Sequence, residues 1–286
     1  MTEPLLPAEL LARLERLQLS TRRRLSGFQT AQHRSVRHGT SLDFADYRQY
    51  HPGDDFRRID YNLYARLDVL ALKLFEAEDD ITVRLLIDTS ASMVAPKLDQ
   101  AVRAAAAVGW IALCRRDAVV VHTFTGATPA RFRGRSDAPA LFAHLERLVA
   151  DGDTRFVAAA SDLLARPGPR GMTVLVSDLM TPEWETGLAR LPARGSDVSV
   201  IHVLDRAEIE PDLFGDVELV DAETGRGVPI SVTADVLKDY RKTAQAWLDD
   251  VSARCRYVGA SYIRLFADDP LEDTLVGGWR AAGTLK

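Results

Sequence analysis

The sequence is poor in cysteine and has no long apolar run. Only Cys114 and Cys255 occur among its 286 residues, and they lack the C-x-x-C spacing of metal or redox sites, so we expect reduced, buried thiols. No apolar stretch approaches the ~20 residues needed to cross a bilayer. The N-terminus also lacks the basic-then-apolar pattern of a signal peptide. These absences predict a cytoplasmic protein without a membrane span.

The short motifs of several common enzyme classes are also missing. The sequence contains no G-x-x-x-x-G-K-[ST], G-x-S-x-G or H-E-x-x-H. Their absence argues against a P-loop nucleotide site, a hydrolase nucleophile elbow and a zinc-protease helix. There is no internal repeat and no low-complexity tract. The 47% hydrophobic and 27% charged residues are typical of a globular protein with a sizeable core.

Arginines are concentrated near the N-terminus, although the net charge of the chain is −5. They are Arg13, Arg16, Arg22, Arg23, Arg24, Arg34 and Arg37. Nucleic acid is one possible partner for such a cluster, but no recognised binding motif accompanies it and only Phe28 offers a nearby ring for base stacking. A solvated helix face or intramolecular ion pairing is the favoured interpretation, so we expect no nucleic-acid partner.

The pentad Asp88-Thr89-Ser90-Ala91-Ser92 is the most informative stretch of the chain. The apolar run before it, Ile81–Ile87, has the length and β-branched content of a buried strand, and a helical stretch from Pro96 to Arg116 follows. The pentad therefore lies on a strand-to-helix loop, at the sheet edge where ligands bind. Its carboxylate and hydroxyl oxygens suit Mg²⁺, Mn²⁺ or Ca²⁺. They also suit a helix cap, and the pentad alone leaves both interpretations open.

Two later stretches favour the metal-site interpretation. Strand Thr173–Ser177 ends at Asp178, and Asp153-Thr154 lies in a glycine-containing loop before a helical stretch. If the parallel strands are adjacent, the three loops converge on one edge. In this order, D-x-S-x-S, Thr154 and Asp178 resemble the metal-ion-dependent adhesion site of von Willebrand factor A domains.

That resemblance implies a set of ligands and a mode of binding. The metal residues would be Asp88, Ser90, Ser92, Thr154 and Asp178. The hydroxyls would contact a Mg²⁺, Mn²⁺ or Ca²⁺ ion directly, and the two carboxylates would contact it directly or through water. Few charged ligands leave such an ion electrophilic. In the A-domain family an acidic residue of a protein partner completes the octahedron, and the resemblance implies the same here.

The segment before the pentad is dense in Arg, Asp, His and aromatic residues. From Gly27 it reads G-x₅-H-R-S, G-x-S-x-D-F, Y-R-x-Y-x-P-G-D-D-x-R-x-I-D and A-R, followed by F-E-A-E and D-T-S-A-S-M. This order resembles the bacterial domain-of-unknown-function family 58, in which such a segment is joined to a von Willebrand A-like domain. The partner most often associated with that family is a MoxR-type AAA+ ATPase, so the resemblance implies an adaptor or co-chaperone role.

The charged residues of this segment can also be interpreted structurally. Carboxylates and guanidinium groups can pair through two-pronged hydrogen bonds and fix an irregular backbone that has few ladder bonds. The acceptors would be Asp54, Asp55 and Asp60, and the donors Arg48, Arg57, Arg58 and Arg66. We predict two parts: residues 1–77, an N-terminal helix and this segment, and residues 78–286, the A-like domain. The segment should pack on that domain as an arm, because it lacks an apolar pattern able to close its own core.

Strands and helices alternate from Ile81 onward. Apolar strands are predicted at 118–124, 172–177 and 198–204, with helical stretches between them, and a hairpin at 215–230 precedes a long helix at 233–254. Alternation of this kind implies right-handed crossovers. The predicted fold class is therefore α/β: a von Willebrand factor A-like, doubly wound, mostly parallel sheet with helices on both faces, plus the N-terminal arm.

Two classes of function compete for this sequence. The first is a non-enzymatic, metal-dependent protein-binding module. The alternative is a Mg-dependent hydrolase or phosphoryl-transfer enzyme that uses Asp88 as its nucleophile. A phosphoaspartate enzyme usually has a second Asp where this chain has Ser90, and it needs a positioned Lys. Lys97 is available, but as a helix-start residue it can simply face solvent. A third possibility, an A-like domain that has lost its metal, is weakened by the intact pentad.

Overall fold

The chain divides into two compact units. The computed structural model describes residues 4–19, 43–51, 56, 59–76, 81–166 and 171–285. Residues 1–21 and 81–286 form one unit, called here the α/β unit, and residues 22–80 form the other, called the arm unit. Within the described ranges, no helix is both long enough and apolar enough to span a membrane.

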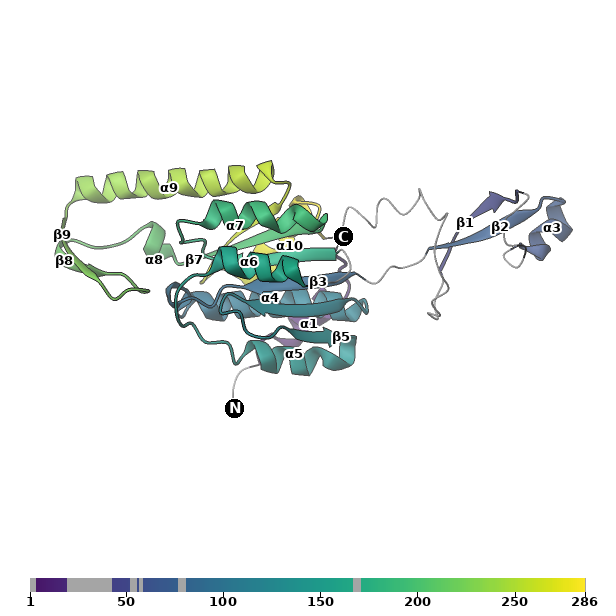
Figure 1. Ribbon diagram of the computed structural model, residues 1–286, viewed down its shortest axis with the longest axis horizontal. Helices are drawn as coiled ribbons and strands as arrows, with labels where there is room; N and C mark the ends of the chain where they lie inside the picture. Colours follow the sequence, from purple (N-terminus) through teal and green to yellow (C-terminus); the bar gives the residue numbers. More distant parts are fainter. Residues whose placement is uncertain are drawn as a thin grey trace. The chain divides into compact units, whose positions relative to one another are not determined.

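A six-stranded sheet forms the centre of the α/β unit, in the order β10-β7-β6-β3-β4-β5 (Figure 1). The strands are β3 (Thr82–Ile87), β4 (Ala118–Thr123), β5 (Ala130–Arg133), β6 (Gly171–Ser177), β7 (Asp197–Leu204) and β10 (Ser261–Phe266). Neighbouring strands are parallel, except that β5 runs antiparallel to β4 at the edge. The predicted mixed α/β class with a mostly parallel sheet is confirmed.

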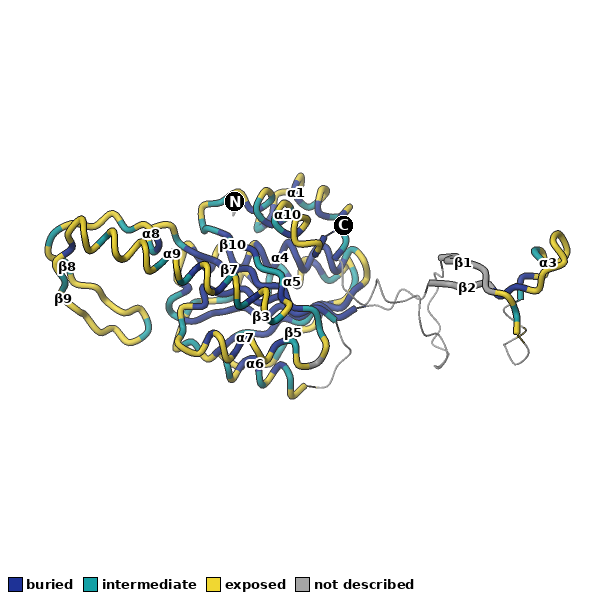
Figure 2. The backbone as a smooth tube through the Cα atoms, turned by 90° about the horizontal axis from the view of Figure 1, so that it is seen from above, coloured by how far each residue is buried: buried dark blue, intermediate teal, exposed yellow. Residues whose placement is uncertain are grey.

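Helices pack against the strands and bury them between two apolar clusters. The helices are α1 (Ala8–Leu14), α4 (Lys97–Cys114), α5 (Ala138–Leu145), α6 (Phe156–Ala165), α7 (Trp184–Arg190), α8 (Arg206–Ile209), α9 (Ala234–Tyr257) and α10 (Leu271–Ala281), with short 3₁₀ turns at Ala91–Met93, Arg135–Asp137 and Leu191–Arg194. Leu85 of β3 belongs to a cluster with α1, α4, α5 and α10. Its neighbour Leu86 belongs to a cluster with α6, α7 and α9. Successive strand residues point to opposite faces, so both faces of β3 are covered (Figure 2).

The N-terminal helix is part of the α/β unit. The buried side chains of Leu10 and Leu14 join the same cluster as α4, and the Trp110 indole N–H donates to the Leu11 carbonyl at 2.9 Å. The sequence analysis grouped this helix with the Arg- and Asp-rich segment in residues 1–77. The division by compactness instead places residues 1–21 with residues 81–286, because the apolar face of α1 is buried against α4.

A second hairpin, β8 (Gly215–Val220) and β9 (Gly227–Val232), forms its own antiparallel sheet. It lies between α8 and the start of α9 in the chain, and beyond the end of the main sheet in Figure 1. Most of its residues are exposed. The predicted hairpin is therefore confirmed, and its turn is free of the main sheet's hydrogen-bond ladder.

The arm unit has regular structure of its own. Strand β1 (Asp43–Gln49) pairs antiparallel with β2 (Ala71–Glu76), with an irregularity between Phe44 and Asp46, and helix α3 (Tyr61–Leu67) lies between them in the chain. The expectation of an irregular backbone with few ladder bonds is wrong for these residues. Of the predicted pairing residues, Asp54, Asp55, Arg57 and Arg58 lie outside the described residues. The packing of this segment on the α/β unit stays a prediction.

Asp60 has a defined role in the arm unit. Its side chain is buried and accepts the backbone N–H groups of Asn62 at 3.0 Å and Leu63 at 3.2 Å, which makes it the N-cap of α3. We expect Asp60→Ala to lower the free energy of unfolding by about 0.5–2 kcal/mol, because two helix-end donors lose their acceptor. Urea denaturation with hydrogen exchange at the two amides measures this. Asp60→Asn is the control, since it keeps the cap; an equal loss in both variants would show that the charge matters more.

Candidate metal centre

The loops that carry the predicted site residues meet at the carboxyl ends of β3 and β6. The Asp88 N–H donates to the Val176 carbonyl at 2.9 Å, which joins the two strand ends. The Ala91 N–H donates to the Gly152 carbonyl at 2.9 Å, and the Asp151 N–H to the Thr89 carbonyl at 2.8 Å. The pentad loop is therefore hydrogen-bonded both to β6, which leads into Asp178, and to the loop that carries Thr154.

Asp88 organises the pentad through its two carboxylate oxygens. Its Oδ1 accepts the Ser90 N–H at 3.0 Å and the Ser90 hydroxyl at 2.7 Å, and its Oδ2 accepts the Ser177 hydroxyl at 2.6 Å. The Ser90 and Ser92 hydroxyl oxygens are 3.0 Å apart. Asp88 and Ser90 are buried, whereas Ser92 is half-buried. The structure thus brings three predicted ligands into one chain of contacts that runs outward from the core.

The helix-cap interpretation of the pentad is wrong. The N-cap of α4 is Pro96, and no side chain caps that helix. Ser90 precedes the 3₁₀ turn Ala91–Met93, but its side chain makes no cap hydrogen bond there. The hydroxyl of Ser90 instead donates to Asp88. The pentad therefore folds around its own carboxylate.

Two buried carboxylates face one another at this edge. Burial raises the pKa of Asp88 to about 6, and the negative charge of Asp178 raises it further, against the lowering effect of the Ser177 and Ser90 hydrogen bonds. Like charges in a site of low polarity disfavour the ionised form. A cation at this edge would relieve the repulsion, so the electrostatics favour binding of a positive ion.

Lys97 already supplies one internal cation. Its ammonium is 2% exposed and donates to Asp178 Oδ2 at 2.8 Å and to Glu208 Oε1 at 2.6 Å. Burial alone would lower the pKa of Lys97, but the two carboxylates raise it above its ordinary value. The expectation that Lys97 faces solvent is wrong. Because Met180 N–H also donates to Asp178 Oδ1 at 3.0 Å, Asp178 is better placed to reach an ion through water than directly.

Thr154 has a partner that the sequence did not predict. It lies two residues before α6, and it is half-buried. Its hydroxyl donates to the carboxylate of Glu223, in the turn between β8 and β9. The predicted site residue is therefore at the expected edge, and a third carboxylate meets it there.

Several residues that support the site were missed in the sequence. Ser177 accepts the Leu179 N–H at 2.9 Å while it holds Asp88; a polar residue that ends an apolar strand is the signal that could have found it. His202 is fully buried, and its Nε2 lies 2.8 Å from the Asp178 carbonyl. A carbonyl only accepts, so Nε2 carries the proton and Nδ1 accepts from the Tyr262 hydroxyl at 2.8 Å. Burial lowers the pKa of His202 to about 4, so the ring is a neutral support for the Asp178 backbone.

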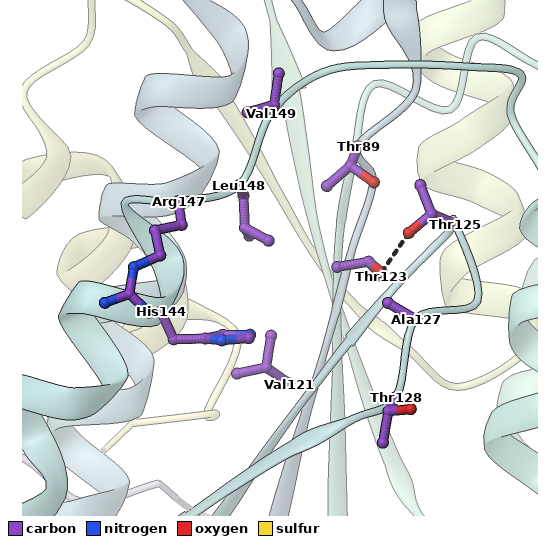
Figure 3. Close-up of a pocket in the computed structure, with 10 residues that line it drawn as sticks. All are labelled: Thr89, Val121, Thr123, Thr125, Ala127, Thr128, His144, Arg147, Leu148 and Val149. Carbon is purple, nitrogen blue, oxygen red and sulfur yellow. Dashed lines mark hydrogen bonds between the residues drawn. The ribbon is translucent and has the colours of Figure 1, made fainter.

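A pocket lies beside the pentad, between the end of β4 and the end of α5 (Figure 3). Its polar lining includes Thr89, Thr123, Thr125, Thr128, His144 and Arg147. The Thr123 and Thr125 hydroxyls are hydrogen-bonded at 2.8 Å. The buried Thr89 hydroxyl makes no hydrogen bond within the described part of the chain. The pocket thus offers polar groups next to the pentad loop, but no carboxylate.

The oxygen atoms of the edge fit a small, hard cation. Adjacent ligands of an octahedral Mg²⁺ with bonds of 2.0–2.1 Å lie about 2.9 Å apart, and the Ser90 and Ser92 oxygens are 3.0 Å apart. Among the described residues, no group of three or more His, Cys, Asp or Glu side chains is arranged to hold a metal ion. Both cysteines are free, and burial raises the pKa of Cys255 to about 12. The donors therefore suit Mg²⁺ or Mn²⁺ better than zinc.

Comparison with known sequences identifies relatives over most of the chain. Residues 46–247 match the family described as Protein of unknown function DUF58. Uncharacterized proteins from Mycobacterium tuberculosis and Mycobacterium bovis are each 30% identical over 272 residues, which cover 91% of this chain and 86% of theirs. Another, from Mycobacterium avium, is 39% identical over 114 residues, or 39% of this chain and 67% of that protein.

Two solved structures are similar over a large part of the chain. The conserved hypothetical protein BatB from Bacteroides thetaiotaomicron has a TM-score of 0.42 at 14% identity, and the match covers 71% of this chain and 98% of that one. An aerotolerance-related membrane protein from Bacteroides fragilis has a TM-score of 0.38 at 17% identity, with 70% and 97% covered. The geometry of the candidate metal centre therefore carries the functional argument.

Proposed function

Because the chain belongs to the DUF58 family of proteins of unknown function, we propose from its own site that it is a non-enzymatic, divalent-metal-dependent protein-binding module. The proposed fold type is a doubly wound, von Willebrand factor A-like sheet. The proposed ion is Mg²⁺, with Mn²⁺ or Ca²⁺ as substitutes. Its residues are Asp88, Ser90, Ser92, Thr154 and Asp178.

The spacing of the pentad oxygens carries this proposal. Asp88 lies at the buried end of the chain of contacts, and Ser90 and Ser92 lead from it toward the surface, with their hydroxyl oxygens at the separation of neighbouring octahedral ligands. Ser92 and Thr154 are half-buried, so the outer side of the site is open to another molecule. A bound ion would supply a Lewis-acidic position there for an external carboxylate.

A protein that presents an Asp or Glu side chain is the partner such a site requires. We propose that this partner is a MoxR-type AAA+ ATPase and that the protein acts as its adaptor or co-chaperone in the cytoplasm. The support for this partner is the family resemblance of the Arg- and Asp-rich segment. The support for the acidic contact is the small number of charged ligands at the edge, which leaves an ion's charge largely uncompensated.

The alternative function, phosphoryl transfer through Asp88, is favoured by one observation. Lys97 is buried in the site and does not face solvent, as a phosphate-binding lysine would be. However, its ammonium is bonded to Asp178 and Glu208. Asp88 is fully buried, and both of its oxygens accept hydrogen bonds. A nucleophile must come within about 3–3.5 Å of the atom it attacks, so the binding module accounts for the geometry better.

Titration with Mn²⁺ tests the proposed site. We expect wild type to bind one ion weakly, and Asp88→Asn to lose binding because the amide removes the charge while it keeps the side chain's shape. Ser92→Ala should weaken binding, since this half-buried hydroxyl is an outer ligand. Thr125→Ala, an exposed hydroxyl outside the ligand set, is the matched control. Calorimetry and electron paramagnetic resonance measure the affinity.

The same proteins test the partner. Immobilised wild type should retain a purified MoxR-type ATPase in Mg²⁺ and release it in EDTA, and Asp88→Asn should not retain it in either buffer. Ion binding in Asp88→Asn as tight as in wild type would refute the site. Retention of the ATPase that is the same with EDTA would refute metal dependence of the partner contact, even if the site binds an ion.

A further inference from the structure

The tip of the β8–β9 hairpin turns one side chain toward the metal centre. Residues 221–229 are all exposed except Glu223, which is half-buried. The Glu223 carboxylate accepts the hydroxyl of Thr154, which lies 69 residues earlier in the chain. An exposed hairpin thus presents a single acidic side chain to one of the proposed ligands.

The turn that carries Glu223 is fixed by its own hydrogen bonds. Asp221 Oδ1 accepts the backbone N–H groups of Glu223 at 3.0 Å and Thr224 at 2.6 Å. The Asp221 N–H donates to the Arg226 carbonyl at 2.9 Å, and Gly225, with φ at +67°, lets the chain turn back. The Glu223 side chain is therefore presented by an ordered turn, which lowers the entropy cost of holding it at the edge.

The position of Glu223 also matches that of a metal ligand. Neighbouring ligands of an octahedral ion are separated by about the length of a hydrogen bond, as the Ser90 and Ser92 oxygens are. A carboxylate oxygen hydrogen-bonded to Thr154 Oγ1 is therefore placed where a ligand adjacent to Thr154 would lie. It also brings a third carboxylate to the edge that already holds Asp88 and Asp178, which increases the demand for a cation.

We propose that Glu223 is an intramolecular ligand of the metal ion and fills the position that a partner's carboxylate would take. This inference rests on the proposed metal site. The β8–β9 hairpin then covers the open side of the centre in the free protein. An acidic partner binds by displacing Glu223, so the hairpin sets a threshold that weak or nonspecific acidic molecules do not pass.

A simpler role for Glu223 is to anchor the hairpin to Thr154 without touching an ion. The two roles differ in what they do to bound Mn²⁺. If Glu223 is a ligand, its removal exposes the ion to an additional water molecule and takes away one negative charge. If it is only an anchor, the water count and the affinity of the ion stay the same.

Glu223→Gln and Glu218→Gln in the full chain separate these roles. Both changes keep the side-chain size and remove one charge from the same hairpin, but Glu218 is an exposed residue of β8. We expect Glu223→Gln to weaken Mn²⁺ binding by roughly tenfold or more and to raise the water-proton relaxation enhancement of the bound ion. Glu218→Gln should match wild type in both. Acetate, a stand-in for a partner's carboxylate, should lower the relaxation enhancement in Glu223→Gln at concentrations that leave wild type unchanged.

The outcomes separate this inference from the function on which it rests. Asp88-dependent Mn²⁺ binding that is identical in wild type and Glu223→Gln, with the same relaxation enhancement, overturns the ligand role and leaves the metal site intact. The same loss in both hairpin variants reduces the effect to general electrostatics and also overturns it. Absence of Asp88-dependent binding in wild type refutes the metal site itself, and the role of Glu223 with it.

Discussion

Lys97→Met is expected to lower the free energy of unfolding by about 3–5 kcal/mol in EDTA, because it removes one partner of a buried ion pair. The Lys97 ammonium lies between Asp178 and Glu208, and Asp178 acts electrostatically on Asp88. Without the lysine, the buried Asp178 carboxylate loses its counterion. The change also leaves Asp88 and Asp178 facing each other with no positive charge between them, a situation that low polarity makes costly.

The response of this variant to metal is the decisive part of the prediction. A divalent ion at the same edge can replace the lost positive charge, so Mg²⁺ should restore part of the stability of Lys97→Met and add less to wild type. Urea denaturation in EDTA and in Mg²⁺ measures both differences. Lys238→Met, an exposed lysine on α9, is the control. Stability of Lys97→Met that is unchanged by Mg²⁺ would show that the ion does not reach the carboxylates.

The buried strands could be predicted from the sequence almost to the residue. Strands β3 and β6 are nearly continuous apolar runs, because parallel strands covered on both faces bury every side chain. Strand β5 was missed for the opposite reason. Its four residues bury only Phe132, and a short antiparallel edge strand with two arginines has no apolar pattern to detect.

The site was predictable only as far as strand ends determine it. Asp88 and Asp178 follow buried strands, so adjacency of β3 and β6 was enough to bring them to one edge. Lys97 and Glu208 are separated by 111 residues, and Glu223 reaches Thr154 from an exposed hairpin. Such contacts depend on how elements pack in three dimensions. Local periodicity carries no record of them, and a lysine in the first turn of a helix is ordinarily unfavourable and solvated.

Phe156→Ala is expected to cost about 3–5 kcal/mol of unfolding free energy, the range for a large aromatic side chain removed from a core. Phe156 is the first residue of α6 and is fully buried. Its ring is stacked on Phe124 with centroids 5.2 Å apart. It also packs on Gly187 of α7, where an added Cβ would lie 2.5 Å from the Phe156 ring. No nearby side chain can expand easily into the space that the ring leaves.

This change should also weaken Mn²⁺ binding, in contrast to Lys97→Met, whose lost charge an ion can replace. Phe156 follows Thr154 by two residues, so a cavity at the start of α6 loosens the loop that positions the threonine hydroxyl. Phe132→Ala is the matched control, because Phe132 is buried in the cluster on the other face of the sheet and should lose stability without losing affinity. Denaturant melts and Mn²⁺ titrations of both variants measure the two effects. Wild-type affinity in Phe156→Ala would mean that the backbone hydrogen bonds between the pentad loop and residues 151–152 are sufficient to position Thr154.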